Sequence, residues 1–184
     1  MRAPFARRSD SDVARLRALV ETGAAGAAGA LSELVGRSVF DHQTTAPQRD
    51  AARESDPRST GVFFEAQGHL RGLVALLLAP VSRDTILNNL LCGRGEGEPG
   101  SESAASALCE VGNIVASRTM SAVADNLGAR ILLSTPKLVT ENAEGELARW
   151  VAERRRSGAV LRLESLLADC DGAFEALLVF ILDP

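Results

Sequence analysis

The sequence contains only three cysteines and two histidines in 184 residues. Cys92, Cys109 and Cys170 are odd in number and far apart, so they predict neither a disulfide framework nor a paired CxxC metal site. His42 and His69 are isolated and have no further ligand types at metal spacing. We therefore expect that this chain binds no metal or other cofactor and works in a reducing, cytoplasmic setting.

Long apolar runs and clustered positive charge are also lacking. The longest apolar run, Gly72 to Pro80, is far shorter than the roughly 20 residues of a membrane helix, and no apolar stretch follows the first arginines as in a secretory signal. A net charge of -4 and a pI near 5.3 offer no broad cationic surface for phosphate backbones. We therefore expect neither a membrane nor a nucleic acid as partner.

The length and the periodicity of the chain predict one α+β domain over residues 1–184. A Gly- and Ala-rich stretch at 23–30 within the first helix would let another backbone approach closely. Proposed helix N-caps are Ser11 and Ser82. The predicted helices are 11–36, a short one from Ser82 to Leu91, 102–127 and 144–156, and the predicted strands are 61–67, 70–79, 129–134, 160–167 and 173–182, with turns at Gly68 and Asp171-Gly172.

The order helix, strand, strand, strand occurs twice, which indicates an internal duplication. Leu16 and Leu108, Gly36 and Gly128, and Val39 and Ile131 are all ninety-two positions apart. The halves cover about 11–92 and 102–184, and a glycine-rich linker at 93–101 lacks the Lys-Ser/Thr ending of a phosphate-binding loop. We expect two long helices on one face of a mostly antiparallel sheet built from both halves.

A polar stripe runs along the second long helix. At about 100 degrees per residue its members fall within an arc of about 80 degrees, whereas apolar residues lie on the other side. Glu110 and Asn113 are the only long side chains in this stripe, because its other members are serines. The stripe consists of Ser103, Ser106, Glu110, Asn113, Ser117 and Ser121, and the apolar side of Leu108, Val111, Val115 and Ala122.

The full pattern is Ser106, three residues, Glu110, two residues, Asn113, and twenty-two residues to Pro136, with the local string EVGNIVA. It resembles the signature of the CheC, CheX and FliY family of chemotaxis phosphatases, which occurs on a duplicated fold of this layout. The resemblance implies dephosphorylation of the phosphoaspartate of a CheY-like receiver domain. The Mg²⁺ that assists the reaction would belong to the receiver.

The two long side chains suit this chemistry. An amide both donates and accepts hydrogen bonds, so Asn113 would hold the attacking water in line with the phosphoryl group. Glu110 would pair with the lysine of the receiver pocket, and we assign it no role as nucleophile or general base. Ser106 either hydrogen-bonds beside Glu110 or is a small residue tolerated on a polar face. Pro136 would shape the turn that follows a strand.

The first half lacks this signature, because the positions at the same offset are Ala14, Ala18, Glu21 and Thr44. We therefore predict a single active face. One signature in the later half is typical of CheX-like members, whereas the clear duplication resembles CheC-like members, and the sequence leaves the subtype open. The alternative function is a non-catalytic module that binds a response regulator or a CheD-like deamidase. Pairing of two copies into a homodimer also stays open.

Overall fold

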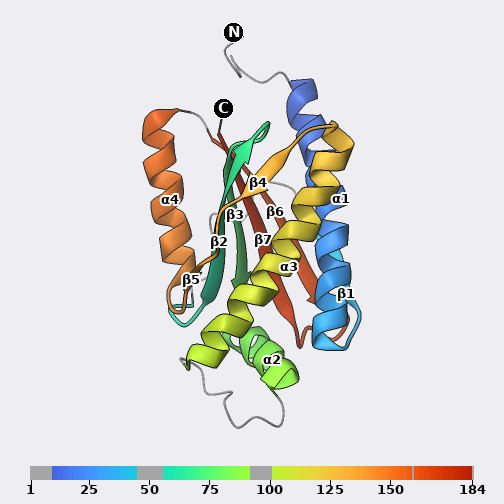
Figure 1. The fold of residues 1–184 in the computed structure, drawn as a ribbon, viewed down its shortest axis with the longest axis vertical. Coiled ribbons are helices and arrows are strands. Elements are labelled where there is room, and N and C mark those ends of the chain that lie inside the picture. The colour runs from blue at the N-terminus through green and yellow to red at the C-terminus, as the bar shows by residue number, and fades with distance from the viewer. Residues whose placement is uncertain (1–9, 45–55, 92–100, 159, 184) are drawn as a thin grey trace.

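A computed structural model describes residues 10–44, 56–91, 101–158 and 160–183. The described parts of the chain contain four helices and seven strands, and these strands belong to one sheet (Figure 1). The helices are α1 (Asp10–Val35), α2 (Pro80–Leu91), α3 (Glu102–Leu127) and α4 (Ala143–Ser157). The strands are β1 (Val39–Thr44), β2 (Thr60–Gly68), β3 (Gly72–Leu78), β4 (Ile131–Leu133), β5 (Lys137–Val139), β6 (Leu161–Asp169) and β7 (Glu175–Leu182).

The strand order of the sheet is β1-β6-β7-β3-β2-β4, with β5 also paired to β2, and every pair is antiparallel. When β1, β2 and β3 are exchanged with β4, β6 and β7 respectively, the same strand order results, read from the opposite edge of the sheet. Each half thus gives its hairpin to the centre of the sheet and its first strand to the other half's edge. This is the order that an internal duplication would give, and the predicted α+β class is confirmed.

Helices cover both faces of the sheet. The helices α1 and α3 lie side by side on one face, and α4 lies on the other (Figure 1). Alternate residues of β2 point to opposite faces, so Val62 and Phe64 join the core beneath α1 and α3, whereas Phe63 joins the core beneath α4 with Leu147 and Val151. The prediction of two long helices on one face is confirmed. The sequence did not predict that α4 covers the opposite face.

The Gly- and Ala-rich part of α1 packs closely against α3. A Cβ added to Gly23 would lie 2.8 Å from Thr119 Cγ2 and 3.1 Å from the Thr119 carbonyl oxygen. Ala24, Ala27 and Ala28 are buried in the same interface. The prediction that small residues here permit a close approach of another backbone is therefore confirmed.

Two predicted helix N-caps are wrong. The helix α1 begins at Asp10 and therefore already contains Ser11. The helix α2 begins at Pro80, a residue well suited to the first position of a helix because it has no N–H to leave unpaired. Ser82 is instead buried inside α2, where its hydroxyl oxygen accepts a hydrogen bond from the backbone N–H of Glu175 at 2.8 Å. It therefore ties α2 to the start of β7.

The strand predicted at 129–134 is shorter than expected and is followed by a second short strand. Proline cannot donate to a ladder, so Pro136 separates β4 from β5. The glycine-rich linker, apart from its last residue Ser101, lies outside the described residues. Within the described parts of the chain, no helix is both long and apolar enough to span a bilayer.

Candidate functional site

The helix α3 carries the predicted site, and both of its ends are fixed by local interactions. The Ser101 side chain accepts a hydrogen bond from the backbone N–H of Ala104 at 3.1 Å, which caps the first turn. Gly128 ends the helix in the left-handed conformation with φ of 57 degrees, and Gly36 ends α1 in the same way with φ of 68 degrees. The predicted bounds of 102–127 are confirmed.

The polar stripe of α3 faces solvent, as predicted. Ser106, Glu110, Asn113, Ser117 and Ser121 are all exposed, and Ser103 is half-buried. Apolar residues on the other side of the helix, among them Leu108, Val111 and Val115, are buried in the core. No hydrogen bond or ion pair occupies the side chains of Ser106, Glu110 or Asn113 within the part of the chain that the structure describes. These side chains are available to an approaching partner.

Gly112 sets the position of α3 over the sheet. A Cβ added to Gly112 would lie 2.6 Å from Val62 Cγ1 and 2.7 Å from Val62 Cβ, so the helix backbone rests directly on β2. This contact lies between Glu110 and Asn113 in the sequence and holds both on the outward side. The sequence analysis did not identify Gly112, although a glycine in the middle of a helix is itself a signal of close packing.

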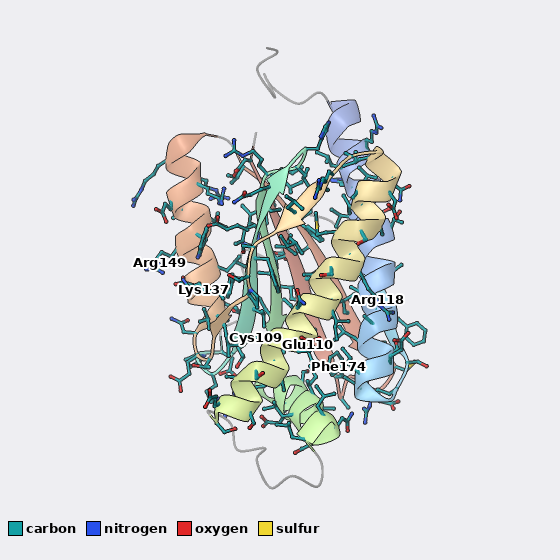
Figure 2. All side chains as sticks on the ribbon, viewed as in Figure 1. Cys109, Glu110, Arg118, Lys137, Arg149 and Phe174 are labelled. Atoms are coloured by element: carbon teal, nitrogen blue, oxygen red, sulfur yellow. The ribbon has the colours of Figure 1, made fainter. Side chains whose placement is uncertain are left out.

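Asn113 and Arg118 lie on opposite flanks of α3. At about 100 degrees per residue, Arg118 is rotated about 80 degrees from Glu110 in one sense and Asn113 about 60 degrees in the other. Arg118 pairs with Glu33 of α1, with N···O distances of 2.9 and 3.2 Å. Asn113 therefore lies on the flank that faces β4 and β5, as does Cys109, which Figure 2 shows on the side of Glu110 away from Arg118.

The turn that contains Pro136 lies along this flank. The strands on both sides of the turn, β4 and β5, contact α3. The backbone N–H of Ser134 donates to the Glu65 carbonyl oxygen at 2.9 Å, and the Glu65 N–H donates to Ser134 Oγ at 3.0 Å. Pro136 is half-buried. The structure thus brings the turn of Pro136 to the flank that carries Asn113. Ser106, rotated about 40 degrees from Glu110 in the same sense as Asn113, lies between the two around the helix.

Between the start of α3 and β5 lies a pocket that both apolar and charged side chains line. Burial raises the pKa of the Cys109 thiol, so this cysteine is mostly protonated at neutral pH and reacts slowly as a nucleophile. The pocket has a volume of about 350 Å³. Its apolar lining includes Leu87 of α2, Leu108 of α3 and Leu138 of β5, and its charged lining is Arg58, Arg83 and Glu141. Across the described ranges, no three His, Cys, Asp or Glu side chains are grouped closely enough to hold a metal ion.

The equivalent face of α1 has no acid and amide pair. Ala14, Ala18 and Glu21 are exposed on that helix. Two methyl groups and one carboxylate offer no group that could both donate to and accept from a water. The absence of a second signature therefore leaves α3 as the only candidate face on the two long helices.

Comparisons with known proteins agree with the fold. Residues 104–140 match the model of the CheC-like family, a span that contains all four signature residues. A CheX from Desulfovibrio desulfuricans has a TM-score of 0.64 at 13% identity, with 90% of this chain and 99% of that chain covered. No curated protein sequence matches the chain.

Two further solved structures share the fold. The CheX-CheY-BeF₃-Mg²⁺ complex from Borrelia burgdorferi gives a TM-score of 0.59 at 14% identity and covers 90% of this chain and 98% of that chain. FliY from Thermotoga maritima gives 0.60 at 17% identity, covering 96% and 92%. The match from α3 through β5 and the shared fold confirm that this chain resembles the CheC, CheX and FliY family of chemotaxis proteins.

Proposed function

We propose that this protein dephosphorylates the phosphoaspartate of a CheY-like receiver domain. The observation that carries the proposal is the exposed acid and amide pair on α3, whose side chains have no partner in the described residues. Asn113, the amide of the pair, lies on the flank of α3 that faces the Pro136 turn. The match to the CheC-like family covers this region, and the similar CheX structure was solved as a complex with CheY. A receiver of this kind works in the cytoplasm, where we place the protein as well.

Asn113 is the residue on which catalysis would depend. Hydrolysis of a phosphoryl group requires mainly that a water be held in line and that charge be compensated. The amide of Asn113 can accept from the water with its oxygen and donate to a phosphoryl oxygen with its nitrogen. Because Gly112 rests on β2, the backbone that carries Asn113 is fixed before the partner arrives. A fixed backbone lowers the cost of ordering the water in the complex.

Glu110 would act as the docking contact. It is exposed, so a lysine of the receiver can reach it without displacing a partner of its own. An ion pair of this kind fixes the orientation of two proteins as they associate. Charge on the phosphoryl group would be compensated by the divalent cation of the receiver.

The test compares three variants in phosphate release from a phosphorylated receiver with Mg²⁺. Asn113→Ala should lower kcat by a factor of about 100 or more, the range for a lost catalytic contact. Glu110→Gln should raise KM about tenfold, the equivalent of about 1.4 kcal/mol for a docking charge, with a smaller change in kcat. Asn126→Ala is the control, because Asn126 is also exposed on α3 but bonds its own helix at the Ala122 carbonyl oxygen. Equal rates for wild type and Asn113→Ala would refute the catalytic role.

A second candidate function is a module that binds a receiver or a CheD-like deamidase without catalysis. The observation in its favour is that the first half has the same fold but carries no acid and amide pair on the exposed face of α1. Binding of the receiver that persists while the rate of phosphate loss equals that of the receiver alone would favour this function. Binding that is weakened by Glu110→Gln would show that the same face of α3 makes the contact.

A further inference from the structure

Lys137 follows Pro136 directly and is held from the opposite face of the sheet by α4. Its Nζ lies 2.9 Å from Glu146 Oε1 and 5.9 Å from the centre of the Trp150 ring. Glu146 is also bonded by Arg149 Nη2 at 2.6 Å and by Trp150 Nε1 at 3.2 Å. Figure 2 shows Lys137 and Arg149 together beside α4, on the side of β5 away from α3. We call Lys137, Glu146 and Trp150 the α4 clamp.

The carboxylate of the clamp, Glu146, stays ionised over the physiological pH range. Hydrogen bonds from Arg149 and then from Lys137 lower the pKa of Glu146 to about 2, so its carboxylate is ionised at any pH at which the protein works. The Trp150 ring is held from a second direction by Arg154, whose guanidinium carbon lies 5.5 Å from the ring centre. Arg154 in turn pairs with Asp183 at the end of β7 at 2.5 Å. The ring is therefore a fixed surface for the stem and the ammonium group of Lys137.

The strand that carries Lys137 needs such support. β5 has three residues and pairs only with β2, through Gly61, Val62 and Phe63. A ladder this short at an edge opens easily, because few hydrogen bonds hold it. Pro136 cannot add a bond on its N-terminal side, since it has no N–H. Side-chain contacts of Lys137 thus supply what the ladder lacks.

The clamp and the candidate site meet on one strand. Lys137 is paired with Phe63, and the next residue, Val62, supports Gly112 of α3. Phe63 points into the core beneath α4, whereas Val62 points into the core beneath α3. A shift of β5 along β2 would therefore move the Pro136 turn relative to Asn113. Because α3 contacts both strands that flank this turn, the shift would also change the packing of α3 against them.

We propose that the α4 clamp positions the Pro136 turn against the Asn113 flank of α3, so that Lys137, Glu146 and Trp150 are positioning residues of the site. The proposal rests on the proposed phosphatase function for its kinetic consequence. It assigns α4, which lies on the far face of the sheet, a role in the geometry of the site. The proposal also has a structural consequence, close packing of the Pro136 turn against α3. This packing can be measured without any phosphatase activity.

The kinetic test uses Lys137→Met, which keeps an apolar stem over Trp150 and removes the charge. It should lower kcat about three- to tenfold while KM changes less than about twofold, because small misplacements of reacting groups act on the chemical step. Lys137→Arg can pair with Glu146 and stack on Trp150, and should restore most of the loss. Glu146→Gln should act like Lys137→Met. Arg37→Met is the control, since it removes the ion pair with Asp169 of β6, which pairs with the edge strand β1.

The structural test measures how fast a thiol reagent modifies Cys109, with Cys92 and Cys170 replaced by serine. Cys109 is half-buried on the flank of α3 that faces β4 and β5, so its labelling rate reports how closely the Pro136 turn packs against α3. Lys137→Met should raise this rate and Arg37→Met should not, at a temperature well below both melting temperatures. If labelling responds but even the wild type releases no phosphate, the clamp holds the turn and the phosphatase proposal fails. If Lys137→Met matches Arg37→Met in both assays, the clamp proposal is wrong.

Discussion

Replacing Gly112 by alanine should destabilise the protein, although alanine is the better helix former. The added methyl would lie 2.6 to 3.0 Å from three atoms of Val62, a stiff β-branched side chain. Overpacking of this kind costs about 1–3 kcal/mol, whereas the gain in helix propensity is about 0.5–1 kcal/mol. The midpoints of the two ranges leave a net loss of about 1 kcal/mol, which for a chain of this length lowers Tm by about 2–4 °C.

The control is Gly29→Ala in the neighbouring long helix. Gly29 is exposed in α1, and an added Cβ would meet nothing within 4 Å, so only the propensity gain of about 0.5–1 kcal/mol remains. Thermal and urea unfolding should therefore move in opposite directions for the two variants. In the phosphatase assay Gly112→Ala should also lower kcat, because α3 must lift from β2 and carry Asn113 with it. An increase in Tm for Gly112→Ala equal to that of Gly29→Ala would refute the close contact with β2.

Three further substitutions test the packing and the charges around α1. Gly23→Ala should cost about 1–3 kcal/mol in urea unfolding, because its methyl would meet Thr119 at 2.8 Å. Burial raises the pKa of Asp41 above 3.8, so the charge of this carboxylate opposes folding at neutral pH. Asp41→Asn should therefore raise Tm at pH 7, and this gain in Tm should vanish below pH 3.8. The hydrogen bond from Arg37 lowers the pKa of Asp169 below 3.8, so the stability it contributes is present above pH 3.8 and is lost in acid; Arg37→Met should be less stable at pH 7 and approach wild type below pH 3.8.

The parts of the protein that the sequence predicted depend on local or periodic patterns. A serine before α3 and a glycine after it define the helix ends, since a cap needs only the residues of one turn. The exposed position of Glu110 and Asn113 follows from helical periodicity once one side is apolar. The proposed equivalence of the halves rests on residue pairs at a constant offset, such as Gly36 and Gly128.

The parts that the sequence did not predict depend on contacts between distant segments. Ser82 has the residue type of an N-cap, but its hydroxyl is bonded to a residue of β7. The charged segment around Trp150 forms an amphipathic helix whose apolar side could pack on either face of the sheet. Helical periodicity therefore does not predict which face it covers. The three-residue strand β5 is too short to give an alternating pattern, and only pairing with β2 defines it.

By itself the sequence determined which residues form the stripe on α3 and that the first half has no equivalent, because both depend on spacing along one helix. Tertiary structure decided how that helix is seated and what lies beside it. The contact of Gly112 with Val62 sets the distance of α3 from the sheet. Pairing of β5 with β2 places the Pro136 turn beside the flank of α3 that carries Asn113. On the opposite face of the sheet, Glu146 of α4 binds Lys137 of β5. These contacts join residues separated by fifty or more positions as well as neighbours in the chain. Their geometry follows from the order of the strands in the sheet, which no local pattern encodes.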